Sequence, residues 1–274
     1  MAGMETITIY NQIRDEIQTL FRSRLQTQIM LSLGEGRKQL YELRELTGSS
    51  SQAIIPKIRQ LEAAHYVESV GGEYMLTPLG NVVVSVMENL VKLIAIATRD
   101  HEFWAGHDLG SIPFPLLNDI GALYCSEVVR DTDANIFNVY SHFLQIVNEA
   151  SWIHGLSSVM SPAIANVIEQ QVYAGTTVEL VVNRDIALQL QQEPFNRSIR
   201  KLAEYPNFTV LLAKKPFRLG MTVADRCLSL GLYKRNKSSY DTSTDLVSYD
   251  EKAIDWGERL YQCFRDGTEK ISFL

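Results

Sequence analysis

The sequence has few cysteines, and their spacing excludes two classes of small protein. Its 274 residues contain three, Cys125, Cys227 and Cys263, which lie far apart. No two of them form a Cys-x-x-Cys pair, so neither a disulfide framework nor a zinc ribbon is indicated. We expect all three to be reduced residues of the core.

A positive overall charge is also missing. The formal net charge is −6, which argues against a surface that is basic throughout. The charge is unevenly distributed, however: seven basic residues stand against three acidic ones over 20–60, and three against nine over 81–160. A polyanion would therefore be bound by the N-terminal quarter of the chain.

Long apolar runs without charges are absent as well. No stretch of about 18 apolar residues lacks charged ones, and the first ten residues do not combine a basic region with an apolar run. The sequence thus predicts a cytoplasmic protein that does not involve a membrane. With 46% hydrophobic residues it can bury a substantial core, and we expect two domains, 1–100 and 101–274.

Helical periodicity dominates the first hundred residues. Apolar residues recur at helical spacing over 5–21 and 25–33, and 37–47 predicts a short helix that ends at Gly48. The serines at 49–51 are candidate N-caps for a third helix. Its inward positions are Ile54, Ile58 and Leu61.

A hairpin signal follows these helices. Two β-prone runs, 66–70 and 73–76, are separated by Gly71-Gly72. Three short helices and a hairpin, in this order, predict a winged helix-turn-helix, whose third helix enters the major groove of double-stranded DNA. The alternative is a protein-interaction adaptor that docks a partner through the same helices, which an exposed apolar patch around Ile55 would favour.

The predicted DNA contacts lie mainly on the outer arc of the third helix. Gln52 is suited to a bidentate contact with adenine, and Lys57 and Arg59 to guanine or phosphate. Hydroxyls at the helix start, and cations near the start of the second helix, are candidates for phosphate contacts. The complete candidate set is Ser50, Ser51, Gln52, Lys57, Arg59, Arg37 and Lys38.

Pro56 departs from an ordinary recognition helix, because it removes a backbone donor. Two interpretations stay open: the helix bends there, or its regular part begins near Ile55 with Pro56 in the first turn. The hairpin is also unusual, since Glu68 and Glu73 flank a tip without cations. We expect the wing to contribute little affinity.

The predicted helix over 78–99 carries more apolar surface than one neighbour can cover. Its polar residues form one narrow stripe, made of Ser85, Glu88, Asn89 and Lys92. So wide an apolar face must be buried on several sides. Together with the apolar stripe over 10–21, it predicts a homodimer, whose two-fold symmetry would match a palindromic operator.

Strand-like and helical patterns alternate through the rest of the chain. Strands are expected at 152–159, 178–183, 208–213, 218–223 and 227–233, and helices near 135–150, 163–173, 185–192, 195–204 and 250–265. This alternation predicts an α/β sheet covered on both faces. The fold class is therefore α/β, or α+β over the whole chain, with an N-terminal winged helix-turn-helix and a C-terminal α/β domain.

Several runs also resemble known regulators. LRELTGSSSQAIIPKIRQLE (43–62) and YMLTPLG (74–80) resemble ArsR/MarR-like winged-helix regulators of archaea. HEFWAGHDL (101–109), Ile112-Pro113, SWIHGLSS (151–158) and AIDWGERLY (253–261) are similar to the methanogen filament-regulator (Fil) type. The resemblance spans nearly the whole chain. It implies a transcriptional regulator with a phospholipase-D-like sensor domain, whose small-molecule effector and ligand-binding residues the sequence does not assign.

An enzyme is the rival class, prompted by the phospholipase-D-like resemblance. That chemistry needs a nucleophilic histidine with a lysine two residues on, and none of the five histidines has one. G-x-S-x-G, Walker and G-x-G-x-x-G motifs are absent too, so we predict no catalytic residues and no cofactor. His101 and His107 are six residues apart, not four, which argues against a metal site. Trp152 and Trp256 are expected in the core rather than against a ligand.

Overall fold

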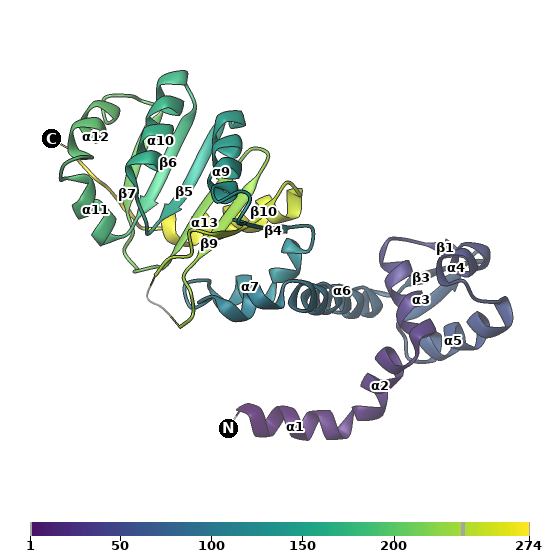
Figure 1. Cartoon of the computed structure of the whole chain (residues 1–274). Coiled ribbons are helices and arrows are strands. Elements are labelled where there is room, and N and C mark those ends of the chain that lie inside the picture. The colour runs from purple at the N-terminus through teal and green to yellow at the C-terminus, as the bar shows by residue number, and fades with distance from the viewer. Residues whose placement is uncertain (1, 237–238, 274) are drawn as a thin grey trace. The chain divides into compact units, whose positions relative to one another are not determined.

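The computed structural model describes residues 2–236 and 239–273, and it divides into two compact units. The first is Met1–Val91 and the second Lys92–Leu274. Each unit has its own elements and its own buried core (Figure 1). The division between them falls within one long helix.

The first unit is a helical domain with a small sheet. In chain order its elements are α1 (Ala2–Gln12), α2 (Arg14–Arg22), α3 (Arg24–Gly34), β1 (Lys38–Gln39), α4 (Leu40–Thr47), α5 (Ser51–Ala63), β2 (Val67–Val70), β3 (Glu73–Leu76) and the start of α6 (Pro78–Arg99). The strands form an antiparallel sheet in the order β1-β3-β2. This arrangement is the predicted winged helix-turn-helix, with α5 as its third helix.

Local sequence explains how α5 and the hairpin form. Gly48, with a φ of 64°, ends α4 in the left-handed conformation, and the serines then lead into α5. The three predicted inward positions of α5 are all buried in the first core: Ile54, Ile58 and Leu61. At the hairpin, Gly71 and Gly72 both have positive φ, as a two-residue turn of the primed type requires.

Two boundaries in this unit were predicted wrongly. The helix expected over 5–21 is two helices, α1 and α2, which are interrupted at Ile13. The second predicted helix starts at Leu40 rather than at residue 37, because Lys38 and Gln39 pair with β3 instead. A capping box fixes that start: the backbone N–H of Gln39 donates to Glu42 Oε2 at 2.6 Å, and the Gln39 side chain accepts from the backbone N–H of Glu42.

Helix α6 extends from the first unit into the second, as its predicted range 78–99 states. Val84 and Met87 belong to the first core, and Ile96 belongs to a core of the second unit. By length and composition alone, α6 is the one helix of the described residues that could cross a membrane, and 22% of its apolar window is buried. Charged Glu88 and Lys92 lie within it.

The second unit is built on an eight-stranded sheet. Its elements are α7 (His101–Gly106), α8 (Phe114–Asn118), a short 3-10 helix η1 (Ile120–Leu123), β4 (Glu127–Arg130), α9 (Asn138–Glu149), β5 (Trp152–Ser157), α10 (Pro162–Ala174), β6 (Thr177–Val182), α11 (Arg184–Leu190), α12 (Asn196–Leu202), β7 (Phe208–Leu212), β8 (Leu219–Ala224), β9 (Leu228–Leu232), β10 (Thr244–Ser248), α13 (Glu251–Arg265) and β11 (Glu269–Lys270). The strand order is β11-β7-β6-β5-β8-β9-β10-β4. Strands β5, β6 and β7 run parallel, and the other neighbours are antiparallel.

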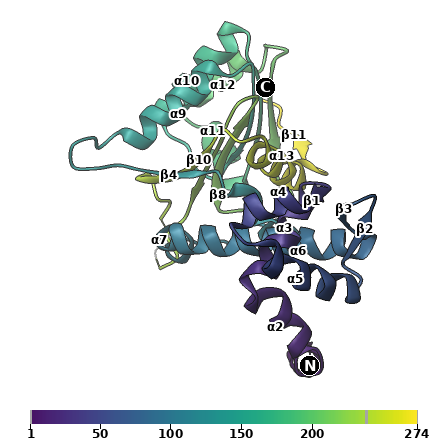
Figure 2. The same cartoon turned by 90° about the vertical axis from the view of Figure 1, so that its right-hand side faces the viewer.

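Helices cover both faces of this sheet, which confirms the predicted α/β arrangement. Alternating side chains of β6 enter different cores. Val178 and Val182 pack into the core beneath α10, α11 and α12, whereas Val181 packs into the core on the α13 side of the sheet. Figures 1 and 2 show α13 on one side of the sheet and α9 to α12 on the other. The alternation follows from the period of two along a strand.

The five predicted strands are present, whereas β4, β10 and β11 were not predicted. The expectation for the cysteines is wrong for two of the three. Cys227 is buried, but Cys125 and Cys263 are exposed. Cys125 follows η1 in a turn, and on α13 the positions that face the core are those of Trp256, Leu260 and Phe264, which leaves Cys263 outside.

Candidate functional site

The outward face of α5 is the first candidate site. Gln52, Ile55, Pro56 and Arg59 are exposed along it, while the opposite side of the helix is fixed by three core residues. A helix held from behind in this way can present its front to a groove. The structure therefore places two of the predicted base-reading side chains, Gln52 and Arg59, on one surface.

Lys57 points to a different side of α5. Together with Gln60 it lines an open hollow of about 770 Å³ that α2 borders, where α2 contributes both Arg22 and Asp15. The Lys57 ammonium donates to Gln60 Oε1 at 3.2 Å. On the outward face, the Arg59 side chain is 72% exposed, and its guanidinium pairs with Glu62 Oε2 at 2.8 Å. The Glu62 side chain is half-buried, but Arg59 itself is open to solvent, and a pair at the surface contributes about 1 kcal/mol, so Arg59 can exchange it for another anion.

The remaining predicted contacts lie at the start of α5 and on β1. Ser50 occupies the N-cap position, is exposed and makes no capping bond through its hydroxyl, and the half-buried Ser51 begins the helix. Arg37 is exposed in the turn before β1, and Lys38 is half-buried in β1. The prediction that these two cations begin a helix is wrong, because strand pairing occupies that segment. Their contact with DNA stays a prediction.

Pro56 lies inside α5, five residues after its start. The interpretation that the regular helix begins near Ile55 is therefore wrong. Because proline has no amide hydrogen, it cannot donate to the Gln52 carbonyl four residues earlier. The Gln52 carbonyl therefore does not receive the bond that another residue at position 56 would give it.

The second candidate site is a cavity in the second unit, between the sheet and α9 and α10. Its volume is about 550 Å³, in the range of small-molecule sites. Its walls are largely apolar and include Ile136, Phe137, Tyr140, Phe143, Ile153, Leu156, Met160, Ile164, Ile168, Leu180 and Met221. Its floor is the α9–α10 side of β5, β8, β9 and β10, where Gly155, Gly220, Thr222, Ser229 and Asp245 face it.

One carboxyl group dominates the polar part of this cavity. Asp245 of β10 is 9% exposed and accepts a hydrogen bond of 2.5 Å from the Ser229 hydroxyl. Burial raises the pKa of Asp245 to about 7, against the lowering effect of Ser229, and nearby Asp241 raises it further. Tyr240 lies alongside: a Cβ on Gly231 would fall 1.8 Å from its hydroxyl and 2.6 Å from Asp245 Oδ1.

Two family models match most of the chain. The model described as "Methanogenesis regulatory protein FilR1, N-terminal domain" matches residues 14–95, and the one described as "Methanogenesis regulatory protein FilR1, middle domain" matches 136–267. The chain belongs to the FilR1 family. The winged helix-turn-helix thus corresponds to the family's N-terminal domain, and the cavity is lined mostly by residues of its middle domain.

A curated FilR1-family relative and two solved structures are similar to the chain. The methanogenesis regulatory protein FilR1 of Methanothrix harundinacea (strain 6Ac) is 23% identical over 258 residues, which is 93% of this chain and 58% of that protein. The chain thus spans little more than half the length of this relative. TrmBL2, an archaeal chromatin protein, aligns with a TM-score of 0.43 at 15% identity, over 89% of this chain and 92% of its own. Nuc of Salmonella typhimurium, a phospholipase D family member, aligns with a TM-score of 0.41 at 12% identity, over 53% of this chain and 97% of its own.

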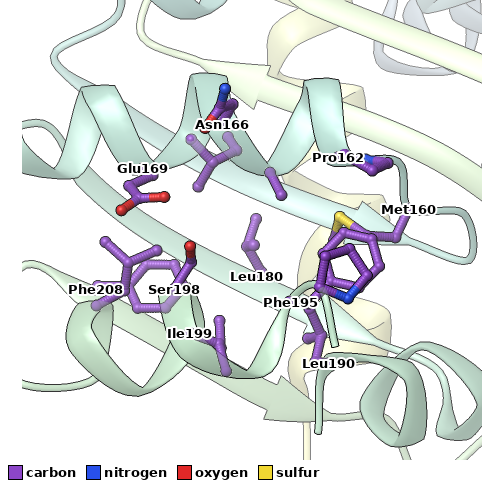
Figure 3. A pocket seen from close by; sticks show the side chains of 14 residues that line it. Met160, Pro162, Asn166, Glu169, Leu180, Leu190, Phe195, Ser198, Ile199 and Phe208 are labelled. Atoms are coloured by element: carbon purple, nitrogen blue, oxygen red, sulfur yellow. The ribbon is translucent and has the colours of Figure 1, made fainter. Parts of the chain in front are cut away.

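A second, smaller hollow lies on the other side of α10 in this FilR1-family chain. It has a volume of about 220 Å³, and Figure 3 shows it between α10, which supplies Asn166 and Glu169, and α12, which supplies Ser198. Met160, Ile168 and Leu180 line both this hollow and the larger cavity. Helix α10 is therefore bordered by open space on two sides.

Asp241 connects the larger cavity to α7. It lines the cavity, and it also pairs with Lys234 at 3.2 Å and with His107 Nε2 at 3.2 Å. Burial raises the pKa of Asp241, but hydrogen bonds from Ser243, Lys234 and His107 outweigh it and leave the pKa below its usual value. The other ring nitrogen of His107 donates to the Phe103 carbonyl at 2.7 Å.

The histidines and tryptophans discussed for other roles have structural partners. His154 binds Glu258 at 2.9 Å and stacks on Tyr261. Trp256 is fully buried and donates to the Leu116 carbonyl, whereas Trp152 is half-buried beside the same core. Neither tryptophan lines the cavity. Within residues 2–236 and 239–273, no three potential metal-ligating side chains gather.

The polar groups of the cavity were not predicted from the sequence. Ser229, Tyr240 and Asp245 come from β9, from the segment before β10 and from β10 itself, and β10 was not predicted. The sequence did contain one signal: Asp245 is the only charged residue in 244–248, and it precedes the apolar pair Leu246-Val247. A charge that begins an apolar strand is a candidate for a functional group.

Proposed function

We propose that this FilR1-family chain is a cytoplasmic DNA-binding transcriptional regulator. Its α5 helix reads the major groove of double-stranded DNA, two copies bind a palindromic operator, and the second unit senses a small molecule. The outward face of α5 carries this proposal, because it combines an amide, an exposed guanidinium and serines at the helix start on a rigid helix. Membership in a family of methanogenesis regulatory proteins supports it.

Selection of bound duplexes from random DNA tests the proposal, followed by binding measurements on the enriched sequence. Arg59→Ala is expected to weaken specific binding by about 1–3 kcal/mol if it contacts a guanine. Lys57→Ala should weaken binding to all sequences and reduce the slope of log affinity against log salt by about 0.9. Arg226→Ala, an exposed cation of the second unit, is the matched control and should change neither quantity.

A second candidate function rests on one observation. Ile55 is 40% exposed in the middle of the α5 face, as expected for an adaptor that docks a protein. A thymine methyl group would also cover such a side chain. If no duplex is enriched in the selection, and Ile55→Ser abolishes binding to a protein partner while Arg59→Ala does not, the adaptor is correct.

The proposed homodimer is supported by the exposed apolar seam of α6. Val82 and Val86 are 65% and 66% exposed, and Leu90 continues the same face one turn later. Residues four apart form one stripe on a helix, which a second copy can cover by two-fold pairing. Val86→Lys should shift the protein to monomer in sedimentation velocity at micromolar concentration. Ser85→Lys, an exposed neighbour off the seam, should leave the dimer intact.

A further inference from the structure

The cavity between the sheet and α9 and α10 has a strong charge preference. Three carboxylic acids line it, Asp131, Asp241 and Asp245, and the described lining contains no lysine, arginine or histidine. An anionic guest would therefore enter a site without a counter-ion, at a large desolvation cost. A cation would find partners.

The three acids differ in how far they are already satisfied. Asp241 is paired with Lys234 and His107, and Asp131 Oδ1 accepts from the Val139 amide at 2.9 Å. Asp245 has only the Ser229 hydroxyl as a partner among the described residues, and no cation faces it. A buried carboxylate with one neutral donor retains lone pairs for another donor. Asp245 is thus the group of this cavity that lacks a counter-charge.

The walls specify the rest of the guest. Phe137, Tyr140 and Phe143 approach from the segment before α9 and from α9 itself, and aliphatic side chains of β5, β6 and α10 face them. Aromatic faces attract cations as well as apolar groups. Next to Asp245, the absence of side chains at Gly220 and Gly231 makes room for Tyr240, because a Cβ at either glycine would collide with its hydroxyl.

We propose that this cavity binds a small organic amine, with its protonated nitrogen on Asp245 and its apolar or aromatic body against α9 and α10. Tyr240, whose ring lies over Gly220 and Gly231, forms the side of the site next to the ammonium group. The proposal rests on the proposed sensing role only for its biological meaning, because binding itself does not require DNA.

Calorimetric titration of the full chain with two matched series tests the inference. The first series is 4-phenylbutylamine, 4-phenylbutanol and 4-phenylbutyrate, and the second is octylamine, octanol and octanoate. Within each series the body is constant and only the head group changes. Each amine should bind at least about tenfold more tightly than its alcohol, and the acid should bind most weakly, because only the amine makes a charge-assisted bond to a buried carboxylate.

Three variants locate the site. Asp245→Asn keeps the shape and should remove the tenfold preference for amine over alcohol. Ile164→Trp should fill the cavity from α10 and weaken amine and alcohol alike. Asp133→Asn removes an exposed carboxylate outside the cavity lining and is the matched control, with unchanged affinities.

The outcomes separate the inference from the proposed function. It is overturned if neither amine binds, if the alcohols or acids bind as tightly, or if Asp245→Asn, shown to be folded by circular dichroism, retains the amine preference. Should Asp245→Asn not fold, the head-group order in the unaltered protein and the effect of Ile164→Trp still decide. Amine binding that leaves DNA affinity unchanged would support the cavity and refute the sensing role. DNA binding without amine binding would overturn the inference and leave the proposed DNA-binding function standing.

Discussion

Asp245 should make the protein less stable as the pH rises toward neutrality, and Asp245→Asn should remove this effect. Burial raises the pKa of Asp245 from 3.8 to about 7, so the folded protein holds this proton more tightly than the unfolded chain does. Between these pH values the folded state binds more protons, and the free energy of unfolding falls with increasing pH. The stabilisation is complete below about pH 4 and is lost as the pH passes about 7.

The shift sets an upper limit on the effect. Each pKa unit corresponds to about 1.36 kcal/mol, so a shift of roughly three units gives at most about 4 kcal/mol between pH 4 and pH 8. The groups facing Asp245 are the Ser229 hydroxyl, Tyr240 and the carboxylate of Asp241. The lowered pKa of Asp241 keeps this carboxylate ionised over the range, and the raised pKa of Tyr240 keeps its hydroxyl neutral, so neither changes charge between pH 4 and pH 8.

Urea unfolding at pH 5, 6, 7 and 8, followed by circular dichroism, measures the effect directly. The free energy of unfolding of the unaltered protein, minus that of Asp245→Asn, should become more negative with each step up to pH 7 and then level off. Asp133→Asn, which changes an exposed carboxylate, should give a pH profile parallel to that of the unaltered protein. Parallel profiles for Asp245→Asn as well would refute the argument that Asp245 is buried without a counter-charge.

Two further predictions concern stability. Trp256→Ala removes a fully buried side chain and leaves the Leu116 carbonyl without its donor. Chemical denaturation should therefore show a free energy of unfolding lower by about 3–5 kcal/mol. A decrease of less than about 1 kcal/mol would contradict this packing. Glu42→Ala opens the capping box of α4 and should lower the free energy of unfolding by about 1 kcal/mol. Glu42→Gln should retain most of the stability, and equal losses in the two variants would argue against the cap.

The parts that the sequence predicts well depend on strong local signals. The inward face of α5 follows from Ile54, Ile58 and Leu61 at helical spacing, and the hairpin follows from two glycines that adopt positive φ. The strands β5 to β9 are runs rich in valine, leucine and glycine that are buried on both faces, and such runs are distinct from the surrounding helices.

The errors arose where pairing across the chain overrides local preference. Lys38 and Gln39 fit the start of a helix, but β3 takes them into the sheet. Strand β10 was missed because its run begins with Thr244 and Asp245, and a charged residue is unusual in a strand whose residues are all buried. Its position depends on pairing with β4 and β9, which lie far apart in the sequence.

The candidate sites divide in the same way. The α5 face lies within one helix, so the sequence alone could propose Gln52, Lys57 and Arg59, although only the structure shows that Lys57 points away from the other two. The cavity draws residues from positions 131 to 245, and no local pattern brings these together. Such a site can be found only after the strand order is known.

Asp241 connects the cavity to a helix outside it, and this connection gives ligand binding a route to the rest of the domain. This carboxylate borders the cavity, and it also pairs with the imidazole of His107, which caps the C-terminal end of α7 through the Phe103 carbonyl. The other end of α7 follows α6 after one residue, Asp100. A guest that attracts Asp241 into the cavity would weaken the contact between Asp241 and His107. A guest that repels Asp241 would strengthen that contact. We expect Asp241 both to line the cavity and to transmit its occupancy to α7, so that His107→Gln would leave amine affinity nearly unchanged but remove the effect of a bound amine on α7.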